Sequence, residues 1–130
     1  MRKLLLSIVL CICSFVVNAQ SLREWVADGQ SIVGQTYTEN GHEITIVKLS
    51  VTDFDLVVVE YIWNLSEIEA RAMSSLLKGN LTKVCETFMK GGNLNDVMLK
   101  YYLDDGVIVA YHDGKKSRVS YFINNEEIKW

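Results

Sequence analysis

Outside the first nineteen residues, the side chains best suited to nucleophilic chemistry are Cys85, His42 and His112. A cysteine nucleophile needs a base within hydrogen-bond reach, so Cys85 with His112 is the one thiol and imidazole pair to consider. Both histidines stand beside predicted turns, whereas Cys85 falls on the apolar stripe of a predicted helix. Buried packing is the preferred interpretation of Cys85, with an intermolecular disulfide or a reactive thiol as alternatives. We therefore predict no catalytic residue.

The acidic residues and the glycines supply no pattern for a metal or a phosphate. Five aspartates stand near predicted turns without the spacing of a calcium loop: Asp53, Asp55, Asp104, Asp105 and Asp113. Gly91-Gly92 lacks the neighbouring Lys and Ser or Thr of a phosphate-binding loop. We expect neither a metal site nor a cofactor.

Aromatic and β-branched residues gather instead in the segment Phe54 to Trp63, which alternates as a strand does. One face of that strand would carry Phe54, Leu56, Val58 and Ile62. The other would carry Val57, Val59, Tyr61 and Trp63, which we take as the candidate interaction face. Apolar residues on both faces predict a central strand covered on both sides, or a strand with one face partly open to a partner.

Residues 1–19 have the pattern of a secretory signal peptide. Arg2 and Lys3 precede an apolar run that ends in Val17-Asn18-Ala19, and this run is shorter than the roughly 20 residues of a membrane-spanning helix. We expect cleavage after Ala19, export to the periplasm or secretion, and no stable membrane insertion afterwards. Cys11 and Cys13 follow bulky residues within the run, which argues against a lipid-anchored form.

The remaining segment, residues 20–130, has the length of a single domain. Loss of Arg2 and Lys3 leaves 11 basic residues against 16 acidic ones. Nucleic acid is bound through clustered Lys and Arg, so we expect no nucleic-acid partner. Another envelope protein is the expected partner. Cys85 is the only cysteine left in this segment, which excludes an internal disulfide within it.

The first half of residues 20–130 has the pattern of a helix followed by antiparallel strands. Ser21 and Glu24 form a capping box for a helix that continues to about Val33. Asn40-Gly41 predicts a tight hairpin turn, because both residues tolerate positive φ. Two strands are predicted beyond this turn, at 44–51 and 54–63.

A long amphipathic helix is predicted at 66–90, capped by Asn64 or Ser66 and ended by Gly91-Gly92. Its apolar stripe recurs every three or four residues and comprises Ile68, Ala72, Leu76, Leu77, Leu81, Val84, Cys85 and Phe88. This stripe is expected to pack on the sheet. Gly79-Asn80 is expected to kink or split the helix, because glycine costs about 1 kcal/mol there relative to alanine.

Periodicity does not decide the segment 95–103, which fits either a strand or a short helix. Strands are predicted more firmly at 107–112 and 118–123. The turn sequence Asp113-Gly114-Lys115-Lys116 joins these two strands into a hairpin. Residues 124–130 are predicted to be a polar tail that ends in an exposed or loosely packed Trp130.

Val84-Cys85 and the later run Leu103 to Lys116 resemble a group of small exported proteins of Gram-negative bacteria. There, a cysteine near a helix end is followed by a short helix, a glycine, a strand with tyrosines and a turn with Asp, Gly and Lys. The resemblance covers roughly the C-terminal third and implies an exported α+β protein, with a helix at 95–103 and no assigned activity. Members often have a second C-terminal cysteine that could pair with the first, but this chain ends without one.

These patterns together predict a two-layer α+β sandwich, with an antiparallel sheet of four to five strands and helices packed on one face. The functional expectation is an exported, non-enzymatic domain that binds a protein or another component of the cell envelope. The alternative is a carrier of a lipid or metabolite, with a pocket between helix and sheet. A small hydrolase is the third hypothesis, since no nucleophile, base and orienting group can be assembled from the sequence.

Overall fold

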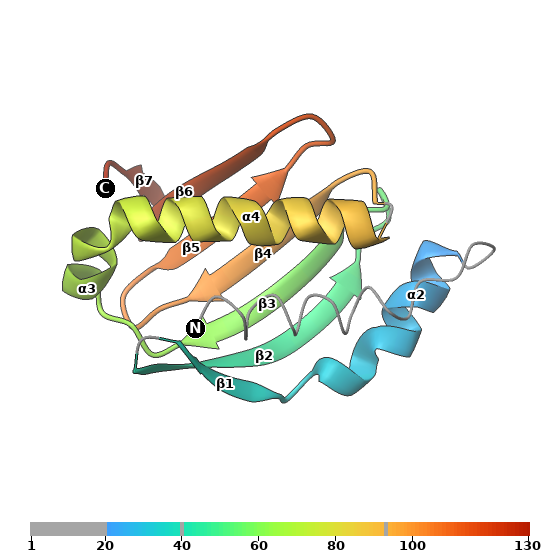
Figure 1. Cartoon of the computed structure of the whole chain (residues 1–130), viewed down its shortest axis with the longest axis horizontal. Helices are drawn as coiled ribbons and strands as arrows, with labels where there is room; N and C mark the ends of the chain where they lie inside the picture. Colours follow the sequence, from blue (N-terminus) through green and yellow to red (C-terminus); the bar gives the residue numbers. More distant parts are fainter. Residues whose placement is uncertain (1–20, 40, 93) are drawn as a thin grey trace.

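The fold is α+β, with a seven-stranded mixed sheet and a long helix across it (Figure 1). It was obtained as a computed structural model of the whole chain, and the residues that the structure describes are 21–39, 41–92 and 94–130. The predicted signal peptide and Asn40 of the predicted turn lie outside these residues. The predicted α+β class is confirmed.

In the described part of the chain, the strands neighbour one another in chain order, and only one pair is parallel. They are β1 (Thr36–Glu39), β2 (His42–Val51), β3 (Val57–Trp63), β4 (Val97–Tyr102), β5 (Val107–His112), β6 (Ser117–Ile123) and β7 (Glu126–Ile128). The pair β3 and β4 is parallel, because the chain between them returns over the sheet as a helical crossover. The prediction of four to five antiparallel strands is therefore wrong in strand number and in direction.

The N-terminal helix begins at the predicted N-cap Ser21, with the serine half of the predicted capping box formed, and its α-helical part ends before the predicted Val33. In α2 (Leu22–Asp28), the Ser21 hydroxyl accepts a hydrogen bond from the Glu24 N–H at 3.2 Å. At Gly29 the chain tightens into a short 3-10 helix, η1 (Gly29–Ile32). A Cβ atom at Gly29 would come within 2.9 Å of Leu49 Cδ2, so this glycine permits close packing on β2.

The central helix breaks at a different place from the one predicted. Its two parts are α3 (Glu67–Ala72) and α4 (Ser74–Gly92), separated at Met73, and α4 continues through Gly79. A capping box between Ser66 and Glu69 starts α3. Of the predicted stripe, Ile68, Ala72 and Leu76 are exposed, and Ala70 is buried instead. From Leu77 to Phe88 the predicted stripe is buried as expected.

The structure also differs from the prediction in three segments, namely 54–56, 95–103 and 124–130. Phe54 lies in a turn before β3 and is 92% exposed. Residues 97–102 form β4, because pairing with β3 and β5 satisfies their backbone, so the helix favoured by the resemblance is wrong. The polar tail contains β7, which follows a turn with positive φ at Asn124 and Asn125.

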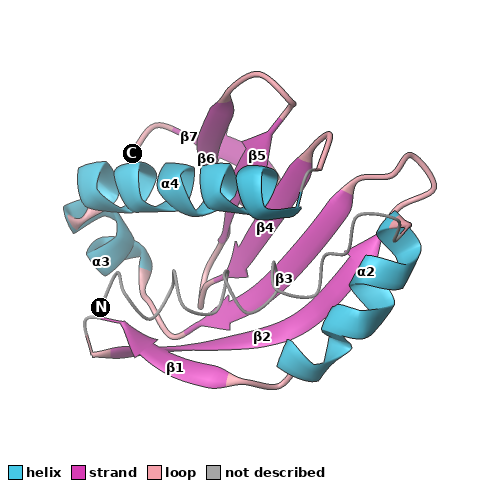
Figure 2. Cartoon of the chain, turned by 45° about the vertical axis from the view of Figure 1, so that its right-hand side comes forward, coloured by secondary structure: helices cyan, strands magenta, loops and turns pink. Residues whose placement is uncertain are grey.

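The helices α2 and α4 lie on the same side of the sheet (Figure 2). Helix α4 packs against β4, β5 and β6, whereas α2 packs against β2. Together with the side chains of the sheet that face them, which we call the inner face, they form one hydrophobic core. In the described part of the chain, no helix is both long and apolar enough to cross a membrane.

Candidate functional site

The predicted interaction face lies within the core. Val57, Val59, Tyr61 and Trp63 alternate along the inner face of β3 and are at most 2% exposed in the complete chain. A surface already open to a partner must therefore be sought on the opposite face of the strand. The physical reason is the two-residue period of a strand, which places the adjacent residues Val58, Glu60 and Ile62 on the other side.

Aromatic rings dominate the inner face around the parallel strand pair. Tyr61 and Tyr101 stack with their ring centroids 4.4 Å apart, and the ring of Trp63 lies 5.6 Å from that of Tyr101. The indole nitrogen of Trp63 is buried without a hydrogen-bond partner among the described residues, and the buried hydroxyl of Tyr101 makes no well-aligned hydrogen bond there, although it interacts with the Tyr61 hydroxyl. Burial raises the pKa of Tyr101 well above its ordinary value. Such unpartnered groups typically cost about 1–3 kcal/mol each.

The thiol and the two histidines do not form a common site among the described residues. Cys85 is fully buried, and burial, with a smaller effect of Glu86, raises its pKa to about 12. This confirms the predicted packing role. The described hydrogen bond of His112 is to the backbone N–H of Gly114, which its Nδ1 accepts at 3.0 Å.

His42 has a structural contact at the other end of the sheet. Its Nε2 lies 2.7 Å from the Glu69 carboxylate, and its Nδ1 lies 2.6 Å from the carbonyl oxygen of Asn64. The pKa of Glu69 is lowered, first by the Ser66 hydroxyl and also by His42. These contacts tie β2 to the start of α3. The part of the chain that the structure describes contains no group of His, Cys, Asp or Glu arranged to hold a metal ion.

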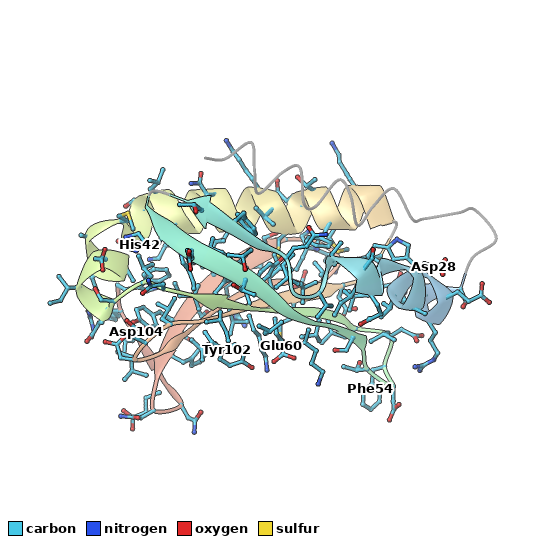
Figure 3. All side chains as sticks on the ribbon, turned by 90° about the horizontal axis from the view of Figure 1, so that it is seen from below. Asp28, His42, Phe54, Glu60, Tyr102 and Asp104 are labelled. Atoms are coloured by element: carbon cyan, nitrogen blue, oxygen red, sulfur yellow. The ribbon has the colours of Figure 1, made fainter. Side chains whose placement is uncertain are left out.

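The face of the sheet opposite α4 carries both apolar and charged side chains. We call it the open face, and it comprises Val58, Glu60, Ile62, Met98, Lys100, Tyr102, Val107, Val109, Tyr111, Arg118, Ser120 and Phe122. Figure 3 shows Glu60 and Tyr102 on the side of the sheet away from α4. No helix among the described elements covers this face, and Ile62 on it is 54% exposed.

A hollow of about 510 Å³ lies in the open face across β4, β5 and β6. Its apolar lining is provided by Leu56, Met98, Val109, Tyr111 and Phe122, and its polar lining by Lys100, Arg118 and Ser120. The volume is within the range of protein pockets that bind a small molecule or accept a large side chain. The hollow can therefore bury an apolar group beside two positive charges.

The charges of the open face differ in how they are compensated. Glu60 accepts a hydrogen bond from the Tyr102 hydroxyl, which raises the pKa of Tyr102 to about 12, and it also lies 4.0 Å from Lys48 Nζ. No carboxylate of the described chain forms an ion pair with Lys100 or Arg118. These two cations remain available to an acidic group of a partner.

The candidate interaction face predicted from the sequence is the buried face of β3, and the sequence did not indicate that β4 to β6 contribute to the opposite face. The alternation of Met98, Lys100 and Tyr102 was a usable signal, but it competed with a helical interpretation of the same segment. Without the pairing of β4 with β3, the residues of the hollow cannot be assigned to one surface. No protein-family model, curated protein or solved structure matches the chain.

Proposed function

We propose that the protein is an exported, non-enzymatic domain that binds another protein of the cell envelope through its open face. The observation that carries this proposal is the apolar hollow beside Lys100 and Arg118, on a sheet face without a described helix over it. Apolar surface of this kind, flanked by charge, is typical of protein interaction sites. Export rests on the signal-peptide pattern of residues 1–19.

The chemistry of the hollow specifies the kind of partner. A matching segment would place a large apolar or aromatic side chain against Val109, Tyr111 and Phe122. It would place Asp or Glu next to that side chain, where Lys100 and Arg118 can pair with it. Burial of the apolar group would supply most of the affinity, whereas the charge pairs would orient the segment.

Two isoleucines provide a matched test of this proposal. Ile62 is 54% exposed on the open face, and Ile68 is 81% exposed on α3. Ile62→Glu should weaken capture of the partner from an envelope extract by about tenfold or more, because burial of such a side chain contributes about 1.5–3 kcal/mol. Ile68→Glu should bind as the unmodified protein does. Equal binding by both variants would contradict the proposal.

A second candidate function is a carrier of a small lipid or metabolite that binds on the inner face. The observation that favours it is the pair of buried, unpartnered polar atoms at Trp63 and Tyr101, which could hydrogen-bond a ligand beside the Tyr61 ring. Most buried polar groups have such a partner. The pocket would then lie between the helices and the sheet.

Tryptophan fluorescence tests the carrier function on the chain that begins at Gln20, the form expected after export. Titration with palmitate and with a lysophospholipid should change the emission of Trp63 saturably for at least one of the two. The change should disappear in Trp63→Phe, which retains Trp25 and Trp130. Emission that stays constant in both titrations would count against this function.

A further inference from the structure

A second surface hollow lies between the C-terminal half of α4 and the hairpin of β5 and β6, away from the open face. This groove has a volume of about 750 Å³. The charged residues of its lining are Lys83, Glu86, Lys90, Lys115 and Lys116. Positive charge therefore dominates the groove, although the chain as a whole has a net charge of −3.

The local charge determines what the groove attracts. Exposed charges are screened beyond about 8 Å at physiological ionic strength, so a compact anion inside the groove interacts mainly with the lining lysines. A long polyanion such as nucleic acid would extend over the acidic remainder of the surface. The charge distribution consequently favours a small anion with its charge concentrated in one group.

Two polar groups of the lining lack a hydrogen-bond partner. His112 is 9% exposed, and because its Nδ1 accepts the Gly114 N–H, its ring proton resides on Nε2. Nε2 makes no hydrogen bond within the described chain and is not among its fully buried atoms, so it can donate to a ligand in the groove. The hydroxyl of Ser117, the cross-strand neighbour of His112, is buried and also unpartnered there. Since buried donors are nearly always hydrogen-bonded, the Ser117 hydroxyl indicates a missing acceptor.

The turn that carries two of the lysines has a fixed shape. The Asp113 carboxylate accepts hydrogen bonds from the N–H groups of Lys115 and Lys116 at 2.9 and 3.0 Å, and these bonds lower the pKa of Asp113. Gly114 has a φ of +94°, and a Cβ atom there would lie 2.9 Å from the Asn95 carbonyl oxygen. The hairpin lysines therefore start from an ordered backbone, which lowers the entropy cost of binding.

We propose that the groove binds the phosphate group of a small hydroxylated organic phosphate. A phosphate presents several strong acceptor oxygens, which suit lysines from α4 on one side, lysines from the hairpin on the other, and the free donors of His112 and Ser117. The groove is much larger than a phosphate ion, so an organic part can occupy the remainder beside Met89. Glu86 is placed to accept a hydrogen bond from a hydroxyl of that part.

The test uses glycerol 3-phosphate with protein purified from cells that express the whole sequence. Titration should shift the amide resonances of Lys115 and Lys116 and the imidazole resonances of His112 saturably. Lys90→Gln and Lys116→Gln change exposed side chains and should each weaken binding by about tenfold, the loss of roughly one charge-assisted hydrogen bond. The matched control Lys129→Gln, outside the groove, should leave the affinity unchanged.

A parallel experiment distinguishes a soluble phosphate from the headgroup of a lipid. One outcome is that the protein sediments with phosphatidylcholine vesicles that contain phosphatidylglycerol, and that Lys116→Gln abolishes this sedimentation. This outcome would assign the lipid headgroup as the source of the phosphate. Binding of glycerol 3-phosphate without vesicle binding would assign a soluble ligand. Absence of both interactions, or equal weakening by Lys116→Gln and Lys129→Gln, would overturn the proposal. Neither the glycerol 3-phosphate titration nor the vesicle experiment involves residues of the open face. The proposal for the groove and the proposal for the open face can therefore fail independently.

Discussion

At the scale of the residue, burial determines the chemistry of the side chains that first suggested a reactive centre. Cys85 was correctly predicted to be a packing residue, because its neighbours on the helical stripe are apolar. The unpartnered atoms of Trp63, Tyr101 and Ser117 could not be predicted, since a sequence does not show which polar groups find a partner. These atoms are the residue-level features that point to ligands.

The Cys85 thiol should react slowly with an alkylating reagent in the native protein and rapidly in denaturant. Burial raises its pKa from 9.0 to about 12, and the thiolate is the reactive form. Because the folded protein favours the neutral thiol, the burial of Cys85 contributes fully to the free energy of unfolding below pH 9. This contribution decreases as the pH rises towards 12. Absorbance assays with a thiol reagent measure both rates. Equal rates in the two conditions would contradict the buried assignment.

Tyr101→Phe should leave the free energy of unfolding unchanged or raise it by up to about 1 kcal/mol, because the lost hydroxyl has no described partner. Tyr121→Phe is the matched control, since the Tyr121 hydroxyl donates a hydrogen bond to Asp105 at 3.4 Å. The free energy of unfolding of Tyr121→Phe should decrease by about 0.5 kcal/mol. Urea denaturation of both proteins gives the comparison. A larger loss for Tyr101→Phe would mean that its hydroxyl has a partner in solution.

At the scale of the element, local signals were reliable where one interaction decides the structure. The Ser21 cap, the hairpin at Gly41 and the β5–β6 hairpin follow from capping and turn chemistry. Neither the boundary at Met73 nor strand β4 was predicted, and β4 could not be, because it depends on pairing with other strands. Without β4, the hollow of the open face could not be predicted.

Two glycine variants should have opposite effects on stability. Gly79 lies within α4 with open space where a Cβ atom would be, so Gly79→Ala should raise the free energy of unfolding by about 1 kcal/mol. At Gly106 a Cβ atom would collide with the Tyr121 ring and lie 2.7 Å from the Phe122 carbonyl oxygen. Gly106→Ala should therefore lower the free energy of unfolding by about 1–3 kcal/mol. Thermal and urea unfolding of the two variants test these predictions. Effects of the same sign would contradict the packing described around Gly79 and Gly106.

At the scale of the whole molecule, the fold separates three environments. The inner face holds the core between the sheet and its helices, and the open face presents an apolar hollow with two available cations. The groove beside α4 concentrates lysines at a distinct site. A partner protein on the open face and an anion in the groove would contact different residues, so both could bind together. The class α+β could be predicted from the sequence, but these surfaces required the strand order.

The most direct test of protein binding through the open face is site-specific photo-crosslinking in the producing cell. A photoreactive phenylalanine analogue replaces Tyr111 on the open face in one protein, and Leu76, which is 49% exposed on α4, in another. Binding through the open face predicts a discrete protein adduct from position 111 that Ile62→Glu removes, and little or no adduct from position 76. Adducts that form only from position 76, or equally from both positions, would contradict it.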